Sequence, residues 1–173
     1  MRRIPVSFAL VLFPTIAFAE AEKAVEAFIR NTVVPCYKLE GEGRCKLAET
    51  AARPTIHYAG DGAMKIALAF VPWQWDLTGN AMDQMLVVFD QRQNGDWKPT
   101  GRLDRTYGSN PRDLKFFRDG EKVRIEYVGT VVGRRDNRAN PTGSQRFAVE
   151  VLPNGQMRAT KPHGRSMSEA IRG

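Results

Sequence analysis

Four oxygen-bearing side chains stand close together in the middle of the chain, in a polar turn that leads into an apolar stretch. They are Asp76, Thr78, Asn80 and Asp83, with Gly79 among them. The pattern partly matches the calcium loop D-x-[DN]-x-[DN]-G, although it has only two carboxylates and lacks the downstream bidentate glutamate. The same residue types also build ordinary tight turns. Calcium binding and a structural turn therefore both stay open, and we favour the turn.

The densest group of positive side chains lies in a second polar segment, residues 133–143, which has no apolar periodicity and is expected to be an exposed loop. It contains Arg134, Arg135 and Arg138, and Arg146 follows. Guanidinium groups suit carboxylates and phosphates, so the cluster indicates an acidic ligand or an anionic envelope polymer. A solvated loop, in which Asp136 offsets one charge, is the alternative. No stacking motif accompanies the charge, so nucleic acid is not expected.

Trp73 and Trp75 are two residues apart, so their side chains share a face if the segment is extended. Such a pair could form an aromatic platform for a sugar or a peptide. Tryptophan also buries well, and we favour the interpretation that both rings belong to the core.

Sequence-local catalytic motifs do not occur. His57 and His163 are the two histidines, and there is no G-x-S-x-G, H-E-x-x-H or phosphate-loop pattern. Asp76 paired with Asp83 or Asp90 could hydrolyse a cell-wall polymer, because acid/base sites need no local motif. The sequence does not fix the distance within such a pair. We therefore assign no catalytic residue and no cofactor, and hydrolysis stays an alternative to binding.

Cys36 and Cys45 are the only cysteines. An even pair in an exported chain is expected to form a disulfide, and the two glycines between them ease the turn. On the loop-entropy model such a closure contributes roughly 2.5 to 3 kcal/mol. The spacing is not C-x-x-C, so a structural disulfide is expected rather than a redox-active pair.

The first 19 residues are typical of an export signal. Arg2 and Arg3 precede an apolar run, and Ala17 and Ala19 fit a cleavage site. The run is shorter than the roughly 20 residues that a membrane-spanning helix needs. We expect cleavage near Ala19 and a periplasmic or secreted protein that is not an integral membrane protein. Losing both arginines leaves 24 of the 26 basic residues against 19 acidic ones, a charge of +5 that favours acidic partners without requiring them.

Apolar spacing predicts the elements that would position these residues. Residues 20–34 show the three-and-four spacing of a helix that ends at Pro35, and residues 46–52 allow one or two further helical turns. Eight strand candidates follow, joined largely by glycine-containing turns: 55–59, 63–71, 85–89, 97–103, 114–117, 123–132, 147–151 and 157–160.

Some of these segments carry finer expectations. Residues 85–89 contain no polar side chain, as expected of a central strand covered on both faces. Pro99 places its strand near a sheet edge or at a bulge. Residues 63–70 could form a helix instead of a strand, because short apolar runs are ambiguous. Residues 107–111 are expected to be loop.

One helix followed by about eight strands predicts an α+β fold. The helix would pack on a strongly curved antiparallel sheet, as in cystatin-like folds, or would close one end of a partly closed barrel. Element order does not separate these versions. Residues 20–160 are long enough for a single domain with its own core, and residues 161–173 are expected to be a mobile tail.

A family resemblance covers residues 76–151. It consists of a D-L-x-G-x-x-x-D turn that enters an apolar V-V strand, a glycine-containing turn, a D-G hairpin and an Asn-Pro-Thr loop before a strand. This pattern resembles exported bacterial domains of unknown function, including small lipoproteins of the LppP/LprE kind. The chain departs from them in lacking a lipidated cysteine and the paired cysteines before Pro-Thr. The resemblance implies an envelope protein without a known reaction.

These observations together predict a non-catalytic exported protein. It would bind an envelope component or a protein partner through the arginine loop or the tryptophan turn. The sequence leaves its ligand and its oligomeric state unspecified.

Overall fold

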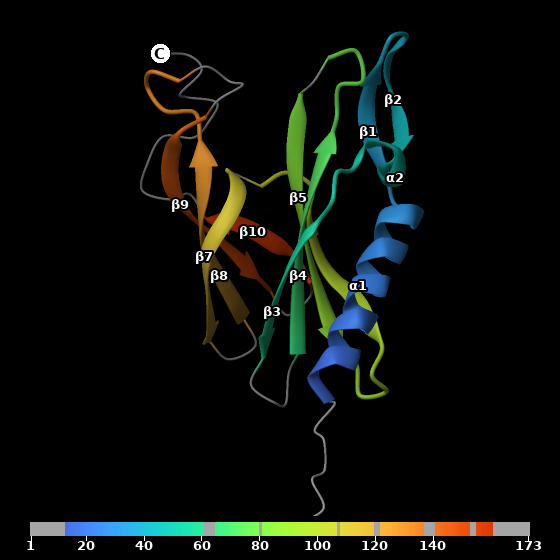
Figure 1. Ribbon diagram of the computed structural model, residues 1–173, viewed down its shortest axis with the longest axis vertical. Helices are drawn as coiled ribbons and strands as arrows, with labels where there is room; N and C mark the ends of the chain where they lie inside the picture. The colour runs from blue at the N-terminus through green and yellow to red at the C-terminus, as the bar shows by residue number, and fades with distance from the viewer. Residues whose placement is uncertain are drawn as a thin grey trace, which may run out of the picture.

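The computed structural model describes residues 13–60, 65–79, 81–106, 108–119, 122–136, 141–152 and 155–160. Two helices and ten strands lie in these ranges (Figure 1). In chain order they are α1 (Phe13–Asn31), β1 (Val33–Lys38), β2 (Gly41–Lys46), α2 (Leu47–Thr50), β3 (Thr55–Gly60), β4 (Lys65–Gln74), β5 (Met82–Gln91), β6 (Trp97–Leu103), β7 (Ser109–Asp119), β8 (Lys122–Val131), β9 (Gly143–Val151) and β10 (Met157–Thr160).

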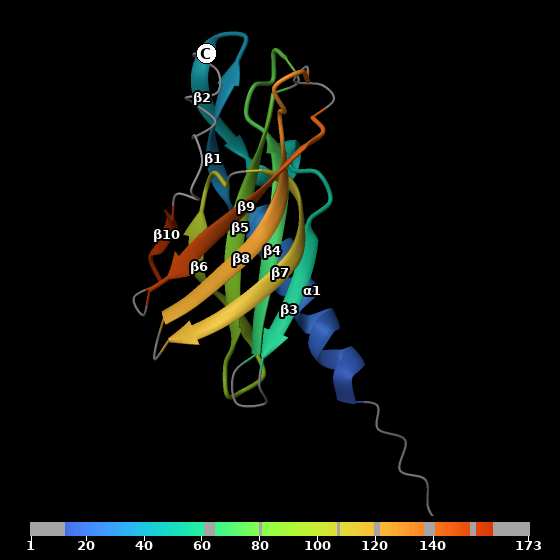
Figure 2. The same ribbon diagram turned by 90° about the vertical axis from the view of Figure 1, so that its left-hand side faces the viewer.

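The strands form three antiparallel sheets. A hairpin of β1 and β2 stands by itself, β3 to β6 make a four-stranded inner sheet in chain order, and β7 to β10 make a four-stranded outer sheet. Helix α1 lies against one face of the inner sheet, and the outer sheet covers the opposite face (Figures 1 and 2). The order of layers is therefore helix, inner sheet, outer sheet.

Strands β4 and β5 lie in the middle of this arrangement and are buried on both faces. Odd-numbered side chains such as Val71 and Val87 join the core beneath α1, because successive side chains of a strand point to opposite faces. Even-numbered ones such as Phe70 and Leu86 join the core shared with the outer sheet. The predicted central strand at residues 85–89 is confirmed.

Helix α1 differs from the prediction at both ends. It begins at Phe13 and ends at Asn31, so Pro35 does not terminate it but lies within β1. Leu47 donates a backbone hydrogen bond of 2.8 Å to the Thr32 carbonyl, and Val33 pairs with Lys46, so the chain enters a hairpin directly after the helix. Within the described residues, no helix has the length and apolar character needed to cross a membrane.

The loop expected between the two cysteines is instead the β1–β2 hairpin. The Cys36–Cys45 disulfide is confirmed, with 5.8 Å between the Cα atoms. The two cysteines occupy diagonal positions, since Cys45 pairs with Val34 and Cys36 with Gly43. The short helix expected within residues 46–52 is also confirmed, as α2.

Each of the eight predicted strand segments coincides with a strand, except that Val132 follows the end of β8 and that residues 63 and 64 lie outside the described residues. The helical alternative for residues 63–70 is wrong over residues 65–70, which belong to β4. Pro99 lies in the edge strand β6, where the pairing register shifts against Val88 and Phe89, as expected. The expected loop at residues 107–111 is wrong from Ser109 onwards, because β7 begins there. The predicted tail, residues 161–173, lies outside the described residues.

The described strands form no closed barrel, because the inner and outer sheets stay separate. After β6 the chain crosses from one sheet to the other instead of continuing the first. Thr106 fixes this crossing: its backbone N–H and its hydroxyl both donate to the Gln84 carbonyl of β5, at 2.7 and 3.1 Å. The coarser expectation of an α+β fold with antiparallel sheets is confirmed.

Phe70→Ala is expected to lower the free energy of unfolding by about 3 to 5 kcal/mol, because the ring is fully buried and its loss leaves a cavity. Its centroid lies 5.3 Å from that of Tyr127 in the outer sheet. Phe117→Ala, at a ring that is 48% exposed, is the matched control and should cost about 0.5 kcal/mol or less. Urea denaturation measures the unfolding free energy of both variants. An equal decrease in the two would contradict the layered core.

Replacing Cys36 and Cys45 together by alanine should lower the unfolding free energy by roughly 2.5 to 3 kcal/mol, the loop-closure entropy for a sequence separation of 9 residues. The reduced parent protein is the control and should lose a similar amount. An unchanged denaturation midpoint for the double variant would show that the hairpin does not unfold with the core.

Candidate functional site

The outward face of the outer sheet carries charged and polar side chains together with Val128 and the exposed Phe117. Ile125 and Tyr127 of β8 point inward and are buried, so Arg124, Glu126 and Val128 point outward. Figure 2 views this face directly, and no described helix or strand lies over it.

Charge on this face is unevenly distributed along the strands. Near the β8–β9 loop, one cross-strand row holds Arg112, Val128 and Arg146, and the next holds Ser109, Thr130 and Ser144. The carboxylates Glu126 and Glu150 occur only farther along, where Glu126 forms a 2.9 Å ion pair with Arg124. Positive charge thus exceeds negative charge at the loop end, where Asp113 follows Arg112.

Arg112 reaches across this end of the sheet from β7. Its Nη1 donates to the Thr130 hydroxyl of β8 at 3.4 Å, and its Nη2 donates to the Ser144 hydroxyl of β9 at 2.8 Å. The guanidinium therefore lies over the strand that carries Arg146, two residues beyond Ser144. Both arginines are exposed, and neither makes an ion pair with a described residue.

The loop after β8 adds Arg134 and Arg135, both exposed in a turn. Asp136 organises this turn: its carboxylate accepts hydrogen bonds from the N–H groups of Gly133 and Thr142 and from the Thr142 hydroxyl, the last at 2.8 Å. These bonds, rather than an arginine, lower the pKa of Asp136 to about 2. A Cβ at Gly133 would lie 2.9 Å from the Asp136 carboxylate, so a larger residue here would require this carboxylate to shift.

We call Arg112, Arg134, Arg135 and Arg146 the arginine surface. Sequence spacing had pointed to the last three, whereas Arg138 lies outside the described residues. Arg112 was missed because it lies between the expected loop at residues 107–111 and the expected strand at residues 114–117. Only the register of β7 against β8, with its two shifts, brings Arg112 opposite Val128.

The two tryptophans lie together on the α1 side of the inner sheet. Trp73 is 2% exposed and belongs to the core, so it offers no open ring face. Trp75 is partly buried, and the Arg105 guanidinium carbon lies 5.7 Å from its ring centroid. Arg105 also forms a 2.8 Å ion pair with Asp83. A ligand that stacks on Trp75 would therefore have to displace Arg105.

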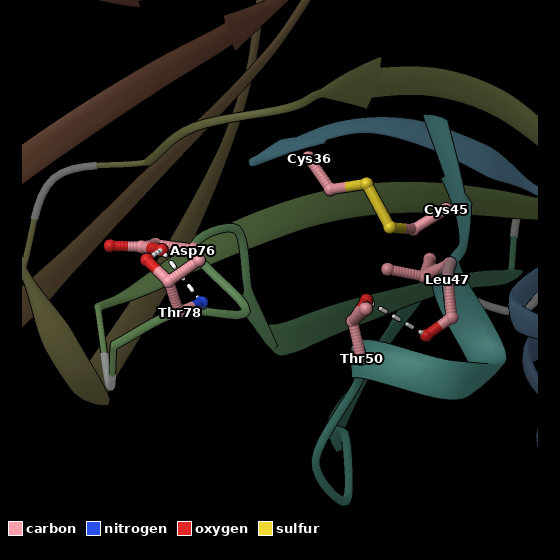
Figure 3. The surroundings of a disulfide bond; sticks show 6 residues. All are labelled: Cys36, Cys45, Leu47, Thr50, Asp76 and Thr78. Carbon is pink, nitrogen blue, oxygen red and sulfur yellow. Dashed lines mark hydrogen bonds between the residues drawn. A yellow bond between two sulfur atoms is a disulfide. The ribbon is translucent and has the colours of Figure 1, made fainter. Parts of the chain in front are cut away.

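The Asp76 turn lies at the β4–β5 tip, beside the disulfide hairpin (Figure 3). Asp76 Oδ1 accepts hydrogen bonds from the Thr78 N–H and hydroxyl at 2.9 and 2.6 Å, which lower the pKa of Asp76. Leu77 donates its N–H to the Tyr37 carbonyl at 2.8 Å, so the turn also holds β1. Asn80 lies outside the described residues, among which no group of three or more His, Cys, Asp or Glu could hold a metal.

The two carboxylates of β5 do not converge. Asp83 lies opposite Trp73 and Asp90 opposite Ile66, at the two ends of the strand and on opposite faces of the inner sheet. Burial raises the pKa of each, and for Asp83 this exceeds the lowering by Arg105. Raised pKa values suit acid catalysis, but these two groups cannot flank one bond.

Comparisons of the chain with protein-family models, with curated proteins and with solved structures found no match.

Asp136→Asn is expected to loosen the β8–β9 turn, because a neutral amide oxygen accepts more weakly than a carboxylate. Amide hydrogen exchange of Gly133 and Thr142 should accelerate.

In the parent protein the contribution of the ionised Asp136 carboxylate to stability should be complete above its ordinary pKa of 3.8. This contribution should be lost as the pH falls toward 2, because the unfolded chain binds the proton first.

NMR titration of the Asp136 carboxyl and hydrogen exchange measure these effects. Asp104→Asn is the matched control, since Asp104 makes only a surface ion pair with Arg102. An Asp136 carboxyl that titrates near 3.8, or equal exchange in both variants, would contradict the hydrogen-bonded turn.

Proposed function

We propose that this protein is an exported, non-catalytic binding protein of the bacterial envelope, and that the arginine surface binds anionic groups of an envelope polymer or of a protein partner. The observation that carries the proposal is the cross-strand row of Arg112, Val128 and Arg146, which holds two exposed guanidiniums and no carboxylate.

The arrangement of the arginines favours an anion as ligand. Two hydroxyls hold Arg112 in place, so little of its rotational freedom would be lost on binding, and its remaining N–H donors stay available. Asp136 similarly orders the turn that carries Arg134 and Arg135. Preorganised guanidiniums bind carboxylate, sulfate or phosphate groups through short charge-assisted hydrogen bonds.

The separation of the arginines favours a ligand with repeated charges. Neighbouring strands lie about 4.8 Å apart, so the backbones of Arg112 and Arg146, two strands apart, are separated by about 10 Å. A polymer or an acidic protein segment would engage several of these side chains together, whereas a single small anion would engage one or two.

Export fits this proposal because the chain contains a disulfide and has no free cysteine among the described residues. The signal-like residues 1–19 and the resemblance to exported domains point to the same compartment. Hydrolysis of a cell-wall polymer by Asp76 with Asp83 or Asp90 is the less favoured alternative. Asp83 and Asp90 point to opposite faces of the inner sheet, so Asp76 could pair with only one of them.

The test is binding to a defined polyanion by the double variant Arg112→Gln/Arg146→Gln. Its dissociation constant for polyphosphate or polyglutamate at low salt should rise on the order of tenfold or more, because each lost charged hydrogen bond contributes about 1.5 to 3 kcal/mol. Added salt should weaken the parent binding and narrow the difference between variant and parent.

The matched control is Arg44→Gln/Arg53→Gln, which removes the same charge at exposed positions away from the outer sheet. It should bind as the parent protein does. An equal loss of polyanion affinity in both double variants would show that binding depends on net charge and would refute a specific arginine surface.

A further inference from the structure

Each four-stranded sheet has two edge strands, whose outer N–H and C=O groups have no partner within the sheet. Such edges invite pairing with another chain unless they are protected by bulges, proline, charge, shortness or a covering segment. The edges here are β3 and β6 of the inner sheet, and β7 and β10 of the outer sheet. These four edge strands differ in how well they are protected against pairing with another chain.

Strands β6 and β10 protect one another. Strand β6 contains Pro99 and a register shift, and β10 is only four residues long. The turn before β10 also presses against β6, since a Cβ on Gly101 would lie 2.8 Å from the Gly155 carbonyl oxygen. No additional strand could pair along β6 without displacing this turn.

Strand β7 is irregular. Its register against β8 shifts twice, and Asn110 and Asp113 have positive φ angles of 48° and 54°. Pro111 lies between them and removes an N–H donor. This edge therefore presents no continuous row of hydrogen-bonding groups.

Strand β3 shows none of these protections within the part of the chain that the structure describes. All six of its residues pair with β4 in unbroken register, and it contains no charged residue and no proline. Among the described residues, no backbone hydrogen bond joins β3 to any segment other than β4. On the α1 side, Ile56 and Tyr58 pack against the core beneath α1.

We propose that β3 pairs antiparallel with β3 of a second copy of this chain, which joins the two inner sheets into one sheet of eight strands. A twofold axis beside His57 keeps the layers of both copies aligned, since residues opposite each other then share a face. It places Ile56 opposite Tyr58 of the second copy, an aromatic and β-branched pair of the kind that stabilises sheets.

A second copy fits this edge better than an unrelated peptide. The strand has no charged side chain with which to select a charged partner, whereas pairing with itself brings no like charges together. The arginine surface faces away from the inner sheet, so pairing leaves it open. The dimer would then carry two arginine surfaces, and a polyanion long enough to span both would bind more tightly through avidity.

Site-specific cross-linking of the full chain tests both the pairing and its register. His57→Cys should form an intermolecular disulfide under mild oxidation, because the two cysteines would be directly opposite each other across the axis. Thr55→Cys is the control: its two copies would be four residues out of register, roughly 13 Å apart and beyond the ~7 Å reach of a disulfide. Equal cross-linking of both variants would overturn the proposed register.

Analytical ultracentrifugation gives the second measurement. The unmodified protein should show a concentration-dependent equilibrium between monomer and dimer, and His57→Lys, which opposes like charges across the axis, should raise the dimer dissociation constant on the order of tenfold or more. Ser109→Lys, on the protected edge strand β7, should leave the dimer dissociation constant unchanged. A parent protein that stays monomeric at high micromolar concentration would overturn the proposal, whatever the outcome of the polyanion test.

Discussion

Burial of β4 and β5 on both faces is the constraint on which the remaining structure depends. Two adjacent strands with almost no exposed side chains require a cover on each side, and α1 supplies one while the outer sheet supplies the other. The outer sheet thus has one apolar face turned inward and one face left for water. The arginine surface exists because that second face is under no packing requirement and can carry charge.

Much of the fold followed from local patterns. The eight expected strands and the central position of residues 85–89 could be predicted because alternation, apolar runs and turn residues act over a few positions. The errors arose where pairing with residues distant in the sequence determines the local structure. Val33 and Val34 left the helical pattern to pair with Lys46 and Cys45, and residues 109–111 became strand because β8 lies beside them.

The candidate site was only partly predictable for the same reason. Arg134, Arg135 and Arg146 cluster in the sequence, but Arg112 reaches Ser144 across 32 positions, through a register that two bulges set. The carboxylates illustrate the reverse case. Asp83 and Asp90 lie in the same strand, yet their odd spacing turns them to opposite faces of the sheet. The odd or even spacing of residues within a strand and the pairing register between strands, rather than residue type, decide which side chains meet.

The single crossing at Thr106 has a consequence for how the protein is made. Every strand of the inner sheet precedes every strand of the outer sheet, so synthesis completes one sheet before the other begins. Until β8 and β9 emerge, Leu68, Phe70, Leu86 and Val88 have no apolar cover. The nascent chain therefore passes through a stage at which the apolar side chains on one face of β4 and β5 are exposed. Protection of that surface by a chaperone would favour correct folding over aggregation.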